Sequence, residues 1–101
     1  MSEIPSALSL QGRVAVVTGA GRGIGAATSQ LLARAGAHVA LLDRDAAGVT
    51  RTAEAIGVAG GEALPFTNDI TDSFAVERTL DRVVEEWGRL DVLVNNAGEL
   101  R

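Results

Sequence analysis

The fold of this 101-residue chain is decided by residues 17–25, which read Val17-Thr18-Gly19-Ala20-Gly21-Arg22-Gly23-Ile24-Gly25. The glycines follow a short β-branched run and precede apolar residues at helical spacing, so they join a strand to a helix. Glycine lets backbone N–H groups come close to an anion, and the helix that follows offers unpaired N–H groups and a positive dipole end. A flexible loop is the alternative for such a cluster, so the surrounding pattern has to decide.

Three apolar runs, at residues 13–18, 39–42 and 92–94, fill consecutive positions instead of alternating with polar ones. This is typical of strands buried on both faces of a parallel sheet. A fourth strand is expected at 63–67; it carries Pro65, which cannot donate to a ladder and therefore belongs at a sheet edge. Helical patterns separate the strands. The β-α-β-α-β-α-β order predicts an α/β fold, the first half of a doubly wound parallel sheet with strand order 3-2-1-4.

We expect residues 1–11 to be a lead-in segment and residues 12–101 to form one partial domain. The first helix is expected to bury Ile24, Ala27, Thr28, Leu31 and Ala35. The third helix, at about 72–87, is expected to bury Val76, Leu80, Val83, Val84 and Trp87, with Glu85 and Arg89 paired outside. Asp45 is the candidate N-cap of the second helix and Thr71 that of the third. Gly36 is expected to close the first helix and Gly88 the third.

Composition excludes several classes of site. The chain has no cysteine and a single histidine, His38, which rules out disulfides, thiolate zinc sites and multi-histidine metal sites. A net charge of −4 without a basic run argues against nucleic-acid binding. No apolar run approaches the ~18–20 residues that span a bilayer. The first residues do not resemble a signal peptide, so we expect no membrane association and a cytoplasmic location.

Asp43 ends the second predicted strand, 18 positions after Gly25. An acid about 20 residues beyond a glycine-rich turn binds a ribose hydroxyl in dinucleotide-binding folds. The alternative is a plain turn aspartate beside Asp45. A Walker A loop is excluded because the chain contains no lysine.

Three motifs resemble the N-terminal half of the short-chain dehydrogenase/reductase family, from about Leu10 to Gly98: Thr18-Gly19-x-x-x-Gly23-Ile24-Gly25, Asn68-Asp69-Ile70 and Asn95-Asn96-Ala97-Gly98. The resemblance implies a Rossmann domain that binds NAD or NADP. It implies that Gly19, Gly23 and Gly25 line the diphosphate, with Arg22 and Ile24 helping to hold it. It also implies that Asp69 and Ile70 flank the adenine, and that the turn with Asn95, Ala97 and Gly98 borders the cofactor.

The choice between the two cofactors rests on three charged residues. The Asp43 carboxylate would repel a 2′-phosphate by about 1–4 kcal/mol at a few ångströms, which favours NAD. Arg22 and Arg44 stand where NADP-preferring relatives often carry basic residues, although Arg44 could instead stack on adenine and both could be solvated surface charges. We expect NAD, with NADP as the alternative.

No catalytic residue can be assigned. The family uses a Tyr-x-x-x-Lys pair, with a serine and a further asparagine, and this chain contains neither tyrosine nor lysine. We therefore expect the NAD(P)-binding front portion of an oxidoreductase that acts on a small alcohol or ketone, inactive and aggregation-prone alone and homo-oligomeric when complete. The alternatives are a non-catalytic dinucleotide-binding or regulatory module, and a sugar-nucleotide epimerase or dehydratase of the extended type, whose usual glycine spacing differs.

Overall fold

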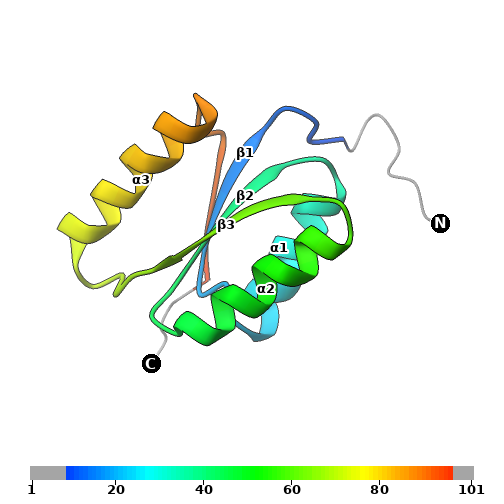
Figure 1. The fold of residues 1–101 in the computed structure, drawn as a ribbon. Helices are drawn as coiled ribbons and strands as arrows, with labels where there is room; N and C mark the ends of the chain where they lie inside the picture. Colours follow the sequence, from blue (N-terminus) through cyan, green and yellow to red (C-terminus); the bar gives the residue numbers. More distant parts are fainter. Residues whose placement is uncertain (1–8, 97–101) are drawn as a thin grey trace.

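The computed structural model describes residues 9–96. Its four strands form one parallel sheet in the order β3-β2-β1-β4 (Figure 1), which confirms the predicted order. The strands are β1 (Val14–Thr18), β2 (His38–Asp43), β3 (Glu62–Thr67) and β4 (Val92–Asn95). The helices are α1 (Gly23–Arg34), α2 (Ala46–Val58) and α3 (Ser73–Trp87).

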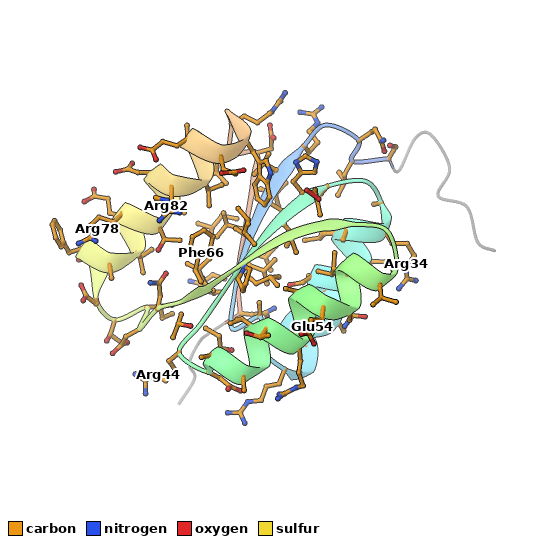
Figure 2. The ribbon with its side chains drawn as sticks, viewed as in Figure 1. Arg34, Arg44, Glu54, Phe66, Arg78 and Arg82 are labelled. Atoms are coloured by element: carbon orange, nitrogen blue, oxygen red, sulfur yellow. The ribbon has the colours of Figure 1, made fainter. Side chains whose placement is uncertain are left out.

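The sheet is covered on both faces. Helices α1 and α2 lie on one face and α3 lies on the other (Figure 1). Alternate residues of β1 and β2 enter two core clusters: Ala15, Val17, Val39 and Leu41 pack with α2, and Val14, Val16, Ala40 and Leu42 pack with Val83 of α3. Phe66 from β3 fills the space between the sheet and α3 (Figure 2). Burial on both faces is the reason that β1 and β2 read as unbroken apolar runs. The same expectation for residues 92–94 was wrong, because Leu93 of β4 is 60% exposed.

Pro65 lies in β3, at the edge of the sheet, as predicted. Asn68 donates its N–H to the Asp43 carbonyl of β2, 2.9 Å away. Because backbone groups alternate in direction along a strand, the nitrogen of Pro65, three residues earlier, points away from β2. The residue that cannot donate therefore occupies a position where no ladder bond is lost.

The buried face of α1 differs from the predicted one. Ile24 and Leu31 are 77% and 56% exposed, whereas Gly25 and Ser29 are buried. The reason is a close approach of the helix to the strand–helix turn: a Cβ at Gly25 would overlap the carbonyl oxygen of Gly19. This contact fixes the rotation of α1, which leaves Ile24 and Leu31 outside while Leu32 packs against the core.

The helix caps agree with the sequence except at α3. Asp45 caps α2 by accepting the Gly48 N–H, and Gly88 closes α3 in the left-handed conformation. The N-cap of α3 is Asp72, which accepts the Ala75 N–H, and not Thr71 as predicted. Thr71 is instead engaged as a donor to Asp69.

Two further predictions for α3 were wrong. Val84 is 44% exposed, because it lies at the margin of the stripe that contains Val83. Arg89 binds Asp91 through two 2.8 Å hydrogen bonds instead of pairing with Glu85, because the helix ends at Trp87 and the chain has turned toward β4.

Asp91 joins the starts of β1 and β4. Its Oδ2 accepts the Val14 N–H at 2.9 Å, and its own N–H donates to the Val14 carbonyl at 2.9 Å. The Arg89 guanidinium above all, and then the Val14 N–H, lower the pKa of Asp91 to about 2. Folding thus stabilises the ionised form of Asp91 relative to its protonated form.

This lowered pKa predicts a contribution to acid stability. Because the pKa in the folded protein lies below the ordinary value of 3.8, the Asp91 bonds stabilise the fold above that value and are lost as the pH falls toward about 2. We expect the free energy of unfolding to fall more between about pH 5 and about pH 2 in the wild type than in Asp91→Asn. Urea titrations along the pH series measure this.

The matched control is Asp81→Asn, which removes an exposed carboxylate on α3 and is expected to keep the wild-type slope. Equal slopes for the wild type and Asp91→Asn would show that the Arg89–Asp91–Val14 bonds do not hold in solution.

Candidate functional site

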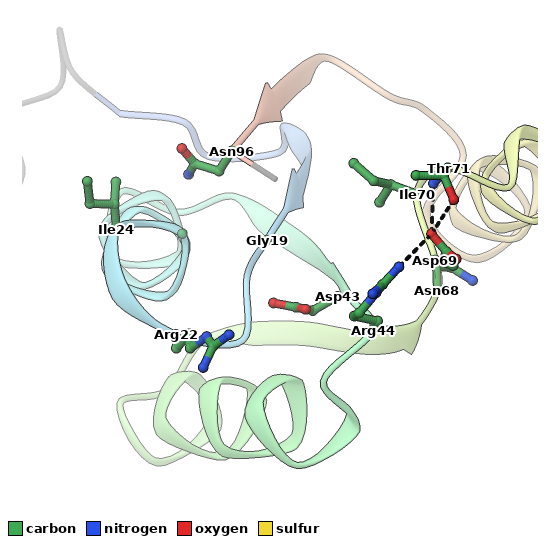
Figure 3. A pocket seen from close by; sticks show the side chains of 11 residues that line it. Gly19, Arg22, Ile24, Asp43, Arg44, Asn68, Asp69, Ile70, Thr71 and Asn96 are labelled. Atoms are coloured by element: carbon green, nitrogen blue, oxygen red, sulfur yellow. Dashed lines mark hydrogen bonds and ion pairs between the residues drawn. The ribbon is translucent and has the colours of Figure 1, made fainter. Parts of the chain in front are cut away.

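An open cleft of about 540 Å³ lies at the carboxyl ends of β1, β2 and β3 (Figure 3). This is the edge of a parallel sheet at which ligands of such folds bind, and the volume is in the range of small-molecule sites. The cleft is lined by Gly19, Arg22, Ile24, Gly25, Asp43, Arg44, Asn68, Asp69, Ile70, Thr71 and Asn96.

The turn between β1 and α1 forms one wall of the cleft. Gly19 and Gly23 have positive φ angles of 65° and 59°, which a side chain disfavours. Several bonds hold the turn to other elements; among them, Ala20 donates its N–H to the Leu42 carbonyl, and Thr52 of α2 donates its hydroxyl to the Ala20 carbonyl at 2.9 Å. The glycine-rich stretch is therefore an anchored turn and not a loose loop.

The N-terminus of α1 differs from those of the other two helices. Its N-cap, Arg22, makes no side-chain capping bond. Helices α2 and α3 are each capped by an aspartate. Within residues 9–96, no side chain caps the first N–H groups of α1 beside the cleft, an arrangement suited to an anion.

Asp43 lines the cleft and also braces the turn. Its Oδ2 accepts the Gly21 N–H at 2.9 Å, and its Oδ1 accepts the Asp45 N–H at 3.1 Å. A Cβ at Gly21 would lie 2.8 Å from Oδ2, so a larger residue there would displace the Asp43 carboxylate. Asp43 thus makes the backbone contacts of a turn aspartate and also lines the cleft; that it binds a ribose hydroxyl stays a prediction.

The loop after β3 forms the opposite wall, where Asp69 receives three contacts. Thr71 donates its hydroxyl at 2.6 Å and its N–H at 3.0 Å, and the Arg44 guanidinium lies 3.2 Å from the same oxygen (Figure 3). The Thr71 hydroxyl first, then its N–H and Arg44, lower the pKa of Asp69. Asn68 is fixed by the Thr79 hydroxyl of α3, 2.7 Å from its Oδ1.

Thr18 connects β1 to the end of β4. It donates its hydroxyl to Asn95 Oδ1 at 2.9 Å and accepts the Asn96 N–H at 2.9 Å. These bonds place Asn96 in the lining of the cleft. Asn95 is directed to Thr18 instead and is not a lining residue.

Eight of the predicted site residues meet in the cleft: Gly19, Arg22, Ile24, Gly25, Asp43, Arg44, Asp69 and Ile70. Gly23 and Asn95 stand beside it without lining it, and Ala97 and Gly98 lie outside the described residues. The lining residues Asn68, Thr71 and Asn96 were not among the predicted site residues, although Asn68 and Asn96 belong to the quoted motifs. That these residues bind a cofactor stays a prediction.

Residues 9–96 contain neither a cluster of metal-ligating side chains nor a membrane-spanning helix. No cluster of three or more histidine, aspartate or glutamate side chains in that range could hold a metal ion. None of the three described helices has the length and apolar character that a membrane crossing requires.

The family model described as short chain dehydrogenase matches residues 13–101. A cis-4-hydroxycyclohexanecarboxylate dehydrogenase from Sinomonas cyclohexanicum is 52% identical over 86 residues, which are 85% of this chain and 34% of that protein. The crystal structure of a hydroxysteroid dehydrogenase from Escherichia coli has a TM-score of 0.88 at 37% identity and covers 91% of this chain and 39% of its own. The crystal structure of a metagenomic short-chain oxidoreductase in complex with NADP has a TM-score of 0.84 at 47% identity. The match covers 89% of this chain and 41% of that protein.

The chain spans about a third of the length of the curated relatives that it matches. The matched part contains the sheet and the cleft described above.

Proposed function

This chain belongs to the short-chain dehydrogenase family, and from that premise we propose that its cleft binds the adenosine diphosphate part of a nicotinamide dinucleotide. NAD is the proposed cofactor. The proposed activity of the whole protein is hydride transfer between that cofactor and a small alcohol or ketone. The observation that carries the proposal is the meeting, in one cleft, of an uncapped helix N-terminus, a glycine turn and the carboxylate that ends β2.

The turn and the start of α1 fit a diphosphate. Two glycines with positive φ and the buried Gly25 keep side chains off this wall, so an anion can reach the backbone N–H groups. The Arg22 side chain, which also lines the cleft, adds a positive charge. We propose that Gly19, Gly23 and Gly25 supply the close approach and that Arg22 and Ile24 border the bound group.

The end of β2 supports NAD over NADP. Asp43 presents a carboxylate that can accept hydrogen bonds from ribose hydroxyls, and the same charge repels a phosphate on the 2′-oxygen. We propose that Asp43 and Arg44 border the ribose, and that Asp69 and Ile70 border the adenine. A related oxidoreductase has been crystallised in complex with NADP, and we propose that in this chain the charges of the cleft decide the choice.

The chemistry of the proposed reaction comes from the cofactor, whose nicotinamide ring donates or accepts hydride when bound. The described residues bind and orient; we assign none of them a catalytic role. The names of the relatives are those of dehydrogenases and oxidoreductases, which does not favour the epimerase or the non-catalytic module. The alcohol or ketone substrate, the homo-oligomer and the cytoplasmic location stay predictions.

Calorimetric titration of the protein with ADP-ribose tests the proposal, because this compound carries the adenosine diphosphate without the nicotinamide. We expect saturable 1:1 binding, and competition by NAD. The matched control is Arg51→Ala, an exposed arginine of α2 outside the cleft lining, which should leave ADP-ribose affinity unchanged, whereas Arg22→Ala should weaken it severalfold. Absence of ADP-ribose binding by a folded wild-type protein would overturn the proposed function.

A further inference from the structure

An ion pair crosses the rim of the cleft between the loop after β2 and the loop after β3. The Nη2 of Arg44 lies 3.2 Å from Oδ1 of Asp69, and both residues line the cleft (Figure 3). We call this contact the Arg44–Asp69 bridge. The bridge determines the position of the Arg44 guanidinium in a cleft for which we propose an anionic ligand.

The two ends of the bridge differ in how firmly they are held. Asp69 Oδ1 also accepts the hydroxyl and the N–H of Thr71, at 2.6 Å and 3.0 Å, so its position is fixed by the local turn. The Arg44 side chain is 72% exposed and carries a long flexible stem. The direction of the Arg44 guanidinium is thus set by Asp69, and not the reverse.

Arg44 follows Asp43 directly in the chain, and both line the same cleft. In Figure 3 the Arg44 guanidinium points to Asp69 and away from Asp43. A guanidinium is the side chain best suited to bind phosphate with two hydrogen bonds. An Arg44 freed from Asp69 could turn to a phosphate beside Asp43, whereas an Arg44 held in the bridge must first leave its carboxylate partner.

We propose that Asp69 is a specificity-determining residue of this cleft. It engages Arg44 and thereby withholds that cation from a 2′-phosphate, so that the cleft selects adenine nucleotides with a free 2′-hydroxyl. Asp43 excludes the phosphate by direct repulsion. Asp69 adds to this selectivity because it pairs with Arg44, the cation that would otherwise offset the repulsion. The inference rests on the proposed function, because it takes the ribose to lie beside Asp43.

The test compares two small probes, adenosine 5′-monophosphate and adenosine 2′,5′-bisphosphate, which differ by the 2′-phosphate. The variant is Asp69→Asn, in which the amide oxygen can still accept the Thr71 bonds while the charge is removed. We expect the affinity for the bisphosphate relative to the monophosphate to rise about fivefold in calorimetric titrations, the upper range for the loss of one exposed ion pair. The affinity for the monophosphate should change less than the selectivity.

Two controls separate the bridge from a general effect of charge. Asp72→Asn removes a carboxylate three residues away that does not line the cleft, and asparagine caps a helix as well as aspartate does; it should leave the selectivity unchanged. In the double variant Arg44→Ala/Asp69→Asn the gain in affinity for the bisphosphate should disappear, because the guanidinium that Asp69→Asn releases is absent.

Unchanged selectivity in Asp69→Asn would overturn the inference while leaving the proposed function intact, provided that the monophosphate still binds. A gain that persists in the double variant, or that Asp72→Asn reproduces, would also overturn it. Failure of the wild type to bind either nucleotide would overturn the proposed function itself, and with it the inference.

Discussion

Replacing Gly25 by alanine is expected to lower the free energy of unfolding by about 3 kcal/mol and to abolish dinucleotide binding. The added Cβ would overlap the Gly19 carbonyl oxygen, and it would lie 2.7 Å from the carbonyl carbon and 3.2 Å from Cα of Ala20. These are backbone atoms of an anchored turn, so no flexible side chain can move aside. The helix must shift away from β1, and its N–H groups leave the wall of the cleft.

Two measurements are needed for this prediction, since stability and binding are expected to fail together. Urea unfolding of Gly25→Ala gives the loss of stability, and calorimetry with ADP-ribose under conditions where the variant is still folded gives the loss of binding. A folded Gly25→Ala protein with wild-type affinity would show that the close approach of α1 to Gly19 is not needed for binding.

The matched control is Gly57→Ala in α2. A Cβ at Gly57 meets no atom within 4 Å, and the φ angle of Gly57 is not positive. This variant should be more stable than the wild type by about 0.5 kcal/mol, because alanine favours the helix and restricts the unfolded chain. Two Gly→Ala changes in helices of one protein are thus expected to have effects of opposite sign.

The sheet could be predicted because its signals are local. Unbroken apolar runs mark β1 and β2, which are buried on both faces, and Pro65 marks an edge strand; the run at 92–94 also marks a strand, β4, but Leu93 in it is 60% exposed. The helix boundaries also follow from single residues, such as Asp45 and Gly88 at the caps. The error at Thr71 has the same origin: two neighbouring residues can cap, and only the contact with Asp69 separates their roles.

The rotation of α1 could not be predicted from periodicity. The helix is rich in small residues, so several of its faces have similar hydrophobicity, and the spacing of Ile24 and Leu31 indicated the wrong one. The decisive interaction is a backbone approach at Gly25, which hydrophobicity does not describe. A signal was present in Ser29, a small polar residue one turn after Gly25 that donates its hydroxyl to the Gly25 carbonyl at 2.8 Å.

The membership of the cleft could be predicted more fully than its internal contacts. The residues follow consecutive parallel strands, whose carboxyl ends meet at one edge. The bond from Gly21 to Asp43 and the Arg44–Asp69 bridge join different loops, and their distances depend on how those loops lie in space. No spacing rule in the sequence specifies that Arg44 turns to Asp69 instead of to the solvent.

Replacing Asp43 by asparagine is expected to shift cofactor preference toward NADP by about tenfold, measured as the ratio of the two dissociation constants. The change removes the charge that faces a 2′-phosphate. Asparagine keeps one acceptor oxygen for the Gly21 or the Asp45 N–H but places an amide group at the other. A loss of about 1 kcal/mol in stability is therefore expected beside the change in selectivity.

The control for charge is Asp45→Asn, two residues away. Asp45 caps α2 through the Gly48 N–H at 3.1 Å and does not line the cleft, and asparagine is an equally good cap. Asp45→Asn should therefore keep the wild-type ratio of dissociation constants. Calorimetry with NAD and NADP on the three proteins decides between a local and a general effect. If both variants moved the ratio equally, net charge would explain the preference, and if neither did, Asp43 would be a brace of the glycine turn with no part in cofactor choice.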